Sequence, residues 1–265
     1  MTNNIKKQIE IIKNSKNIGL MTHLVVGYPN IKTTIKLIET LSKAGSDFIE
    51  LQIPFSDPIA DGPTIMKSCD ISLKNGTNTD LAFEIMLDAT KKVSIPLLFM
   101  CYYNTILHYG VKKFVEKSAE CGVSGFIVPD VPPEEEPYEN FIEICEKNNI
   151  SLIRVVSPAS SEKRLQLNAK YVNDFIYTTS KIGVTGSCSD LDVNLVNSIE
   201  NIKKYFSCPL AVGFGISKPE HVRILSKYVD IAIVGSAIID CINMYKDDEE
   251  KMLEKVYEFV CSLKG

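Results

Sequence analysis

Short apolar runs alternate with longer amphipathic stretches along the whole chain. The apolar runs are bounded by glycine, proline and polar residues, which is typical of strands. Runs such as Ile231 to Val234 are apolar on both faces, as buried parallel strands are. The predicted strands are Ile18–Val26, Asp47–Ile53, Ile95–Tyr102, Ser124–Val128, Ser151–Val156, Asp174–Thr178, Pro209–Val212 and Asp230–Val234.

The stretches between these runs carry apolar residues at helical spacing, three and four positions apart. In one of them, Glu134, Glu135 and Glu136 stand at the start, where negative charge suits the positive end of the helix dipole. The predicted helices are Ile5–Ile12, Lys32–Ala44, Thr64–Lys74, Thr79–Lys92, Val111–Cys121, one that begins at Glu134, Ser161–Ala169, Val193–Tyr205, Lys218–Tyr228 and Ala237–Leu263.

Strands that alternate with helices imply a parallel sheet. Eight such units in 265 residues predict a closed (β/α)8 TIM barrel rather than an open sheet. We expect residues 1–265 to form a single domain, with a short extra helix at the N-terminus, since no linker composition appears. Sites in such barrels lie at the C-terminal ends of the strands, which directs the search for chemistry to those positions.

Composition narrows the class of protein. The net charge is −4 and no Lys/Arg-rich tract appears, so we expect no nucleic-acid partner. No apolar run approaches the roughly 20 residues of a membrane helix, and the N-terminus lacks a signal-peptide pattern. The eight cysteines form no Cys-x-x-Cys pair and the three histidines show no metal spacing. We therefore expect a cytoplasmic protein with reduced thiols, no membrane contact and no metal.

The segment from Phe48 to Pro63 is the most informative part of the chain. Glu50 lies within an apolar strand, on the same face as Phe48 and Gln52, and a carboxylate there is costly unless it is paired or used. The proline-rich loop that follows carries Asp57 and Asp61, and could return an acid towards Glu50 to build a two-carboxylate site. The alternative is a surface turn with a salt-bridged Glu50.

Three glycine-containing loops follow the last three predicted strands. They are Ser180–Gly186, Gly213–Ser217 and Gly235–Ser236, and the last opens a helix directly. Loops of this kind present backbone N–H groups to an anion, and barrels often bind phosphate after strands seven and eight. The pattern favours a phosphate site, whereas the alternative is that these glycines only make tight turns.

Several of these motifs together resemble the tryptophan synthase α-chain family, in the same order and over nearly the whole chain. They are Glu50, the very specific segment Pro-Phe-Ser-Asp-Pro-Ile-Ala-Asp-Gly-Pro from Pro54 to Pro63, Asp130-Val-Pro, Gly183-Val-Thr-Gly186, Gly213-Phe-Gly-Ile and Val234-Gly-Ser. The resemblance implies a lyase of L-tryptophan biosynthesis that cleaves indole-3-glycerol phosphate to indole and glyceraldehyde 3-phosphate by a retro-aldol reaction.

The resemblance also implies roles for single residues. Glu50 matches the acid that protonates indole C3 and takes the glycerol hydroxyl proton, and Asp61 matches the carboxylate beside the ring N–H. Tyr177 and Thr185 match positions that line the site and orient Asp61. The positions that match the phosphate-binding residues are Gly186, Gly215, Gly235 and Ser236. Two strand-end residues are expected to form the indole-facing wall, Met100 and Val128.

This chain departs from the family pattern on two neighbouring strands. Gln52 stands where the family usually has Gly, and His23 and Val25 stand where it usually has Phe and Thr. Gln52 shares the face of Glu50, so we expect it to point into the barrel, with His23 beside it on the first strand. A buried amide and imidazole each need a partner, and the simplest solution is that they bond each other or Glu50. The alternative is a core histidine unrelated to Gln52.

The resemblance implies a partner, the pyridoxal-phosphate β chain, in an α2β2 heterotetramer, with the loops around Asp57 and Asp130 at the interface. No cofactor lysine is recognisable in this chain, so we assign it no cofactor.

Two other functions remain open: an isomerase of phosphorylated sugars, and a non-catalytic protein that has kept the fold. We also expect the loop after strand six, with Thr185 and Ser187, to close over substrate.

Overall fold

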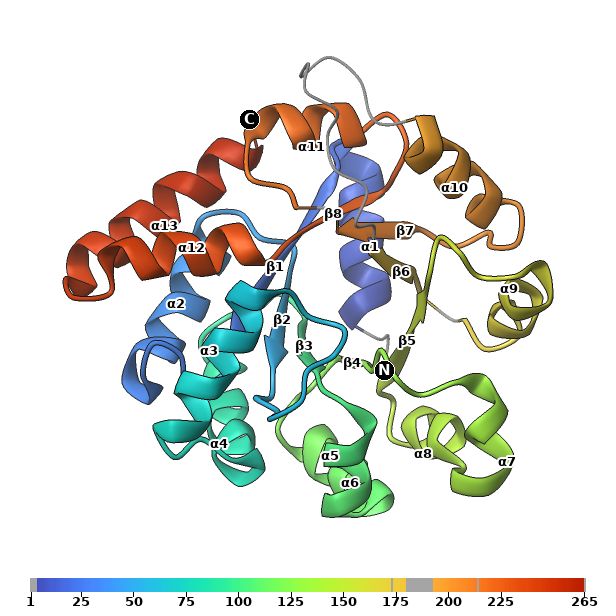
Figure 1. Cartoon of the computed structure of the whole chain (residues 1–265), viewed down its shortest axis with the longest axis horizontal. Coiled ribbons are helices and arrows are strands. Elements are labelled where there is room, and N and C mark those ends of the chain that lie inside the picture. The colour runs from blue at the N-terminus through green and yellow to red at the C-terminus, as the bar shows by residue number, and fades with distance from the viewer. Residues whose placement is uncertain (1–3, 173, 180–192, 214, 265) are drawn as a thin grey trace.

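The computed structural model describes residues 4–172, 174–179, 193–213 and 215–264. Parallel strands β1 to β8 close into a barrel with helices around it, which confirms the predicted (β/α)8 fold (Figure 1). Each strand pairs with the next in sequence and β8 pairs with β1. The strands are β1 Gly19–Val25, β2 Phe48–Gln52, β3 Leu97–Met100, β4 Gly125–Ile127, β5 Ser151–Val156, β6 Ile176–Thr179, β7 Leu210–Gly213 and β8 Ile231–Val234.

The helices cover the outside of the barrel, except α1, which lies across one of its ends (Figure 1). Their bounds are α1 Asn4–Ser15, α2 Ile31–Lys43, α3 Pro63–Lys74, α4 Thr79–Ala89, α5 Tyr103–Tyr109, α6 Val111–Glu120, the 3-10 turn η1 Pro133–Glu135, α7 Glu136–Glu139, α8 Phe141–Lys147, α9 Glu162–Ala169, α10 Val193–Lys203, α11 Pro219–Leu225, α12 Ser236–Tyr245 and α13 Glu249–Lys264. Among the described residues, no helix combines the length and the apolar character needed to cross a bilayer.

The helices differ from the sequence prediction in three places. Helix α5 was not predicted, because its seven residues are too few for a clear apolar period. Its first backbone N–H, that of Tyr103, donates to Asp130 Oδ1 at 2.8 Å, so a distant loop supplies the acceptor. The predicted helix from Glu134 is divided into η1, α7 and α8, and Asn140 between the last two has a left-handed backbone. The predicted helix Ala237–Leu263 is divided into α12 and α13.

The strands alternate between two apolar clusters. Side chains that point outward, such as Ile49 and Leu51 of β2, pack with the helices in the larger cluster. Side chains that point inward, such as Phe48 of β2 and Leu98 of β3, form a smaller cluster within the barrel. Glu50 lies between Ile49 and Leu51 on the strand and therefore shares the inner face with Phe48, as predicted.

Helix α1 closes the N-terminal end of the barrel. Its buried side chains, Ile5, Ile9 and Ile12, belong to the inner cluster. The barrel makes room for them with glycine: a Cβ on Gly19 would lie 2.6 Å from Ile12, and one on Gly125 would lie 3.0 Å from Ile5. Because this end is filled by α1, the opposite end is the one left for a site.

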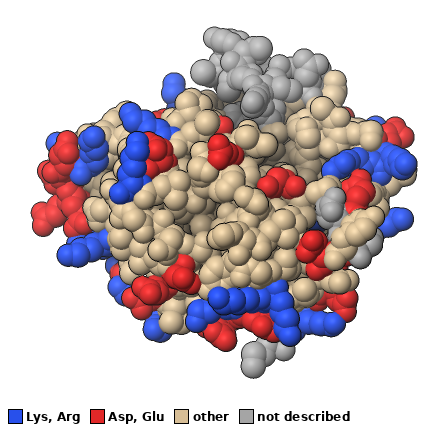
Figure 2. Space-filling model, turned by 60° about the horizontal axis from the view of Figure 1, so that its bottom comes forward, with Lys and Arg blue, Asp and Glu red and all other residues tan. Residues whose placement is uncertain are grey.

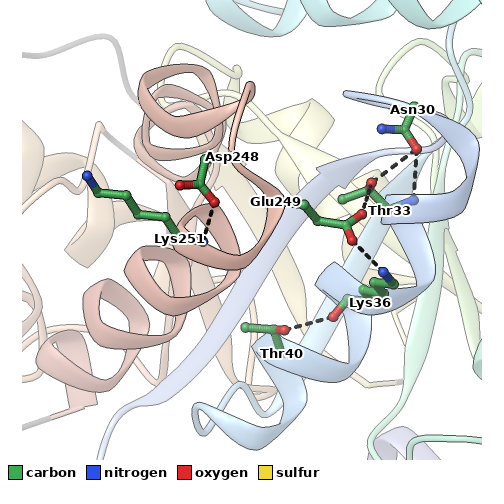
Figure 3. Close-up of polar contacts among 7 residues, drawn as sticks. All are labelled: Asn30, Thr33, Lys36, Thr40, Asp248, Glu249 and Lys251. Carbon is green, nitrogen blue, oxygen red and sulfur yellow. Dashed lines mark hydrogen bonds and ion pairs between the residues drawn. The ribbon is translucent and has the colours of Figure 1, made fainter.

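Polar contacts join the last helix to the second one (Figure 3). Glu249, the first residue of α13, forms an ion pair with Lys36 of α2 and accepts a hydrogen bond from Thr33 Oγ1 at 2.7 Å. Asp248 Oδ1 accepts from the backbone N–H of Lys251 at 3.1 Å and so caps α13. These contacts hold the end of the chain against its beginning. On the face in Figure 2, acidic and basic side chains are interspersed around a largely uncharged centre.

Candidate active site

Glu50 lies inside the barrel, near the C-terminal end of β2. Its residue is 2% exposed, and its partner in the parallel register of β1 is His23, also 2% exposed. The apolar residues around it on β2 face the helices or the inner cluster, so burial of Glu50 follows from the strand alternation that the sequence already shows. Of the alternative, a surface turn with a salt-bridged Glu50, the pairing of Glu50 is present, since His23 lies against its carboxyl group, whereas Asp61 does not stay in a surface turn but bonds Gln52.

One oxygen of Glu50 is hydrogen-bonded to two residues, and the other has no partner within the described residues. His23 Nδ1 and Glu50 Oε1 form a hydrogen bond of 2.8 Å, and the hydroxyl of Tyr177 on β6 donates to the same oxygen at 3.3 Å. Glu50 Oε2 is buried and has no hydrogen-bond partner within the described residues. A buried oxygen that lacks a partner is uncommon in a folded protein, so Oε2 is the atom of Glu50 left for a ligand.

Asp61 is held in the same way. The loop between β2 and α3 brings it back to Gln52, whose Nε2 donates to Asp61 Oδ2 at 2.7 Å. The hydroxyl of Tyr102 donates to the same oxygen at 2.9 Å and accepts a hydrogen bond from the backbone N–H of Ala60, also at 2.9 Å. Phe55 stacks on the ring of Tyr102, with centroids 5.3 Å apart. The loop therefore returns an acid towards Glu50, as predicted from its prolines.

Burial and charge set the ionisation of the groups around Glu50. For His23, burial alone opposes the positive charge, but the pKa is raised because the hydrogen bond and charge of Glu50, the charge of Asp61 and the side chain of Gln52 outweigh it. Burial, with the charges of Glu50 and Asp61, raises the pKa of Tyr177 well above its usual value. Burial and the charge of Asp61 likewise raise the pKa of Tyr102. Both tyrosines are therefore neutral hydrogen-bond donors.

The two predicted wall residues lie on opposite faces of the barrel strands. Met100, at the end of β3, belongs to the inner cluster, against which Tyr177 and Phe55 pack. Val128, just after β4, belongs to the outer cluster that faces the helices. Its neighbour Ile127 is the inward-pointing residue of β4, because successive side chains on a strand alternate.

The glycine positions predicted to bind phosphate lie partly within the described residues. Gly235 precedes α12, and Ser236 is its first residue. A Cβ on Gly235 would lie 3.6 Å from Ile65 and 3.7 Å from His23 Cβ. Helix α12 therefore begins beside His23, the residue that bonds Glu50. Gly215 has a backbone φ of +80°, a conformation that favours glycine. Thr185, Gly186 and the predicted closing loop lie outside the described residues.

Two residues of this arrangement were missed in the sequence. Tyr102 and Phe55 fix Asp61 and its loop, yet neither was named as a site residue. The signal for Tyr102 was available, since it stands two positions after Met100 and so shares its inward face. The inward placement of His23 and Gln52 is confirmed, but they divide their partners: His23 bonds Glu50, and Gln52 bonds Asp61.

Comparison with known proteins gives a family. Residues 9–265 match the family model described as the tryptophan synthase alpha chain. The chain is 40% identical over 260 residues to the tryptophan synthase alpha chain of Petrotoga mobilis, covering 98% of this chain and 99% of that one. It is 39% identical over 262 residues to that of Thermoanaerobacter sp., covering 99% and 98%.

A solved structure gives the same result. The crystal structure of tryptophan synthase subunit alpha from Legionella pneumophila superposes with a TM-score of 0.90 at 28% identity, covering 100% of this chain and 98% of that one. The family model, the full-length relatives and this structure all agree with the barrel fold. The chain belongs to the tryptophan synthase alpha chain family.

Proposed function

We propose that this chain is the lyase of its family, cleaving indole-3-glycerol phosphate to indole and glyceraldehyde 3-phosphate, with Glu50 and Asp61 as the reacting and stabilising acids. One observation supports the assignment of these two acids: each is hydrogen-bonded through one oxygen to two neighbours. The neighbours of Glu50 are His23 and Tyr177. Those of Asp61 are Gln52 and Tyr102. Fixed in this way, each carboxyl group keeps its second oxygen for substrate.

The cleavage requires two proton transfers. Glu50 gives a proton to indole C3, which makes the ring cationic, and Asp61 beside the ring N–H stabilises that charge. The Glu50 carboxylate then takes the proton of the glycerol hydroxyl as the carbon–carbon bond breaks, and the bonding electrons return to the ring. Glu50 Oε2 is the oxygen we assign to both transfers, because Oε1 already has two neighbours.

The remaining predicted residues have supporting roles in this proposal. Met100 and Tyr177 contribute to the wall beside the indole ring. Tyr177 and Thr185 line the site and orient Asp61. Gly186, Gly215, Gly235 and Ser236 bind the phosphate. The N-terminus of the ten-residue helix α12 supports the phosphate role, since its free backbone N–H groups favour an anion.

The substitution Glu50→Gln tests the role of the acid. The amide keeps the size of the side chain but cannot transfer a proton, so indole release from indole-3-glycerol phosphate by the purified chain should be abolished. The matched control is Glu10→Gln, on the exposed side of α1, which should keep full activity. A Glu50→Gln chain that retains a tenth of the wild-type rate, about 1.4 kcal/mol of barrier, would show that Glu50 is not the proton-transfer group.

We also propose a β chain with pyridoxal phosphate as the partner, in an α2β2 heterotetramer. Support comes from family membership and from the loops around Asp57 and Asp130, which follow β2 and β4 at the site end of the barrel. A mixture of the chain with the β chain of its own organism should sediment as one species of heterotetramer mass, and separate sedimentation of the two would contradict the assembly.

We propose a cytoplasmic location. The seven cysteines that lie within the described residues are free thiols, the state that a reducing compartment maintains. Burial raises the pKa of Cys69 to about 12, so this thiol stays protonated and unreactive. Recovery of the chain in the cytosolic fraction of disrupted cells would support this location, and recovery with an oxidising compartment would contradict it.

A further inference from the structure

A buried imidazole stands against the carboxyl group of Glu50. His23 and Glu50 are direct neighbours in the register of β1 and β2, and within the described residues the 2.8 Å contact between Nδ1 and Oε1 is the only ion pair of Glu50. Both residues are 2% exposed, so water does not screen the contact. The pair is thus a strong interaction rather than an incidental one.

The same place holds several buried polar atoms that have no partner. His23 Nε2, Glu50 Oε2 and Gln52 Oε1 are all buried and lack a hydrogen-bond partner within the described residues. All three belong to adjacent inward-facing positions of β1 and β2. Because leaving such atoms unpaired is costly, the cluster is built to meet a polar ligand there.

The surroundings leave His23 as the basic group of the site. Among the residues that the structure describes, the other ionisable groups near the pair are Asp61 from the loop after β2, Tyr102 just after β3 and Tyr177 from β6, none of which carries positive charge. Gly235 before α12 also lies near His23, since a Cβ on it would be 3.7 Å from His23 Cβ, and it carries no charge. Two acids therefore face one imidazole.

We propose that His23 is a positioning residue that shares one proton with Glu50, keeps Oε1 fixed and leaves Oε2 to exchange protons with substrate. This inference rests on the proposed function, in which Glu50 transfers a proton to indole C3. The pair holds one proton beyond that of a neutral imidazole. In the reacting form this proton is on Oε2, and the neutral imidazole donates its Nδ1–H to Oε1. The O–H bond at Oε2 breaks as the C–H bond at indole C3 forms, and the O–H bond of the glycerol hydroxyl then breaks and gives its proton to Oε2.

Sharing a proton has a consequence for pH. Two strongly coupled groups lose their protons in steps that belong to the pair, and the form with one proton spans a wider pH range than a lone carboxyl group allows. The pair loses its last proton only when the imidazole also becomes neutral. The alkaline limb of kcat/KM therefore reports His23 and Glu50 together.

Two substitutions separate positioning from proton sharing. His23→Phe removes both, so we expect the alkaline limb of kcat/KM to move to lower pH by about one unit or more and activity on the plateau to fall. His23→Asn keeps an N–H that can donate to Oε1 but cannot bind a proton. The His23→Asn chain should therefore recover most of the plateau activity, while the alkaline limb of its kcat/KM profile stays at the lower pH seen in His23→Phe. The control is His108→Asn, on the exposed side of α5, which should leave the profile unchanged.

The outcomes distinguish this inference from the proposed function. If the wild-type chain releases indole but the profiles of wild type, His23→Phe and His23→Asn superimpose, the sharing of the proton is wrong and the proposed function stands. If the wild type releases no indole, the proposed function fails, and titration of the His23 imidazole by NMR decides the pairing. A lower pKa of His23 in Glu50→Gln than in wild type supports the pair, whereas equal values overturn it.

Discussion

At the scale of single residues, the site consists of two acids with different surroundings. Glu50 is buried and paired with an imidazole, whereas Asp61 lies on a loop and is held by an amide and a phenol. Each carboxyl group is thus oriented by its own pair of hydrogen-bonding neighbours. Gln52 and His23 are therefore part of how this chain holds its acids.

The Tyr102 hydroxyl links the Asp61 loop to the barrel. In Tyr102→Phe, Asp61 Oδ2 keeps Gln52 but loses its second donor, and the Ala60 N–H loses its acceptor. Loss of a hydrogen bond to a charged group costs about 1.5 to 3 kcal/mol, so kcat/KM for indole release should fall roughly 10- to 100-fold.

A second tyrosine provides the control for this prediction. Tyr109→Phe removes a similar bond, from the Tyr109 hydroxyl to Asp80 Oδ1 at 2.7 Å, at an exposed position away from the acids. Its kcat/KM should match that of the wild type. Equal losses in the two variants would mean that Tyr102 acts through general stability rather than by orienting Asp61.

At the scale of elements, aspartate side chains accept hydrogen bonds where two helices begin, one from a distant loop and one from the residue just before the helix. Asp130, in the loop after β4, accepts a hydrogen bond from the first N–H of α5, and Asp248 caps α13 where a single long helix was predicted. Between α12 and α13 the chain turns, and Glu249 reaches Thr33 and Lys36 of α2 (Figure 3). These contacts join the two ends of the chain on one side of the barrel.

Removing the cap of α13 should loosen this junction. Asp248→Ala leaves the Lys251 N–H without its acceptor and should lower the free energy of unfolding by about 1 kcal/mol, measured by urea denaturation. Asp247→Ala removes the same charge one residue earlier without touching the cap, and Asp248→Asn keeps an acceptor without the charge. Both should stay close to wild type. If Asp247→Ala is as destabilising as Asp248→Ala, charge rather than capping explains the loss.

At the scale of the whole molecule, the two ends of the barrel differ. The N-terminal end is filled by α1, whose isoleucines pack into the inner cluster, and small residues such as Gly19 leave room for them. The opposite end carries the acids and the start of α12. This division fits the general separation of stability and chemistry in such barrels.

The packing of α1 should contribute to global stability. Ile5 is fully buried, and Ile5→Ala should lower the free energy of unfolding by about 2 to 4 kcal/mol, since it leaves a cavity among the inner side chains. Lys7→Ala, on the exposed side of the same helix, should change it by less than about 0.5 kcal/mol. If both variants unfold with the wild-type midpoint and slope, α1 is not part of the cooperative core.

The sequence by itself determined the fold class and the chemistry-bearing segments. Short apolar runs and stripes with helical spacing are local patterns, and eight repeats of them specify the barrel. Strand alternation also determined the inward placement of Glu50, Gln52 and Met100, and the prolines indicated the loop that returns Asp61. These features depend on residues close together in the chain, which is why the pattern is sufficient.

Only the tertiary structure decided which side chains form hydrogen bonds with each other inside the barrel. The division of His23 to Glu50 and Gln52 to Asp61, the contact of Tyr177 with Glu50 and the outward side of Val128 depend on strand register and loop path. A shift of one residue in a strand reverses every side chain, and register is set by packing over the whole barrel rather than by local pattern. The start of α5 likewise depends on tertiary structure, because its first N–H donates to an aspartate 27 positions away in the chain.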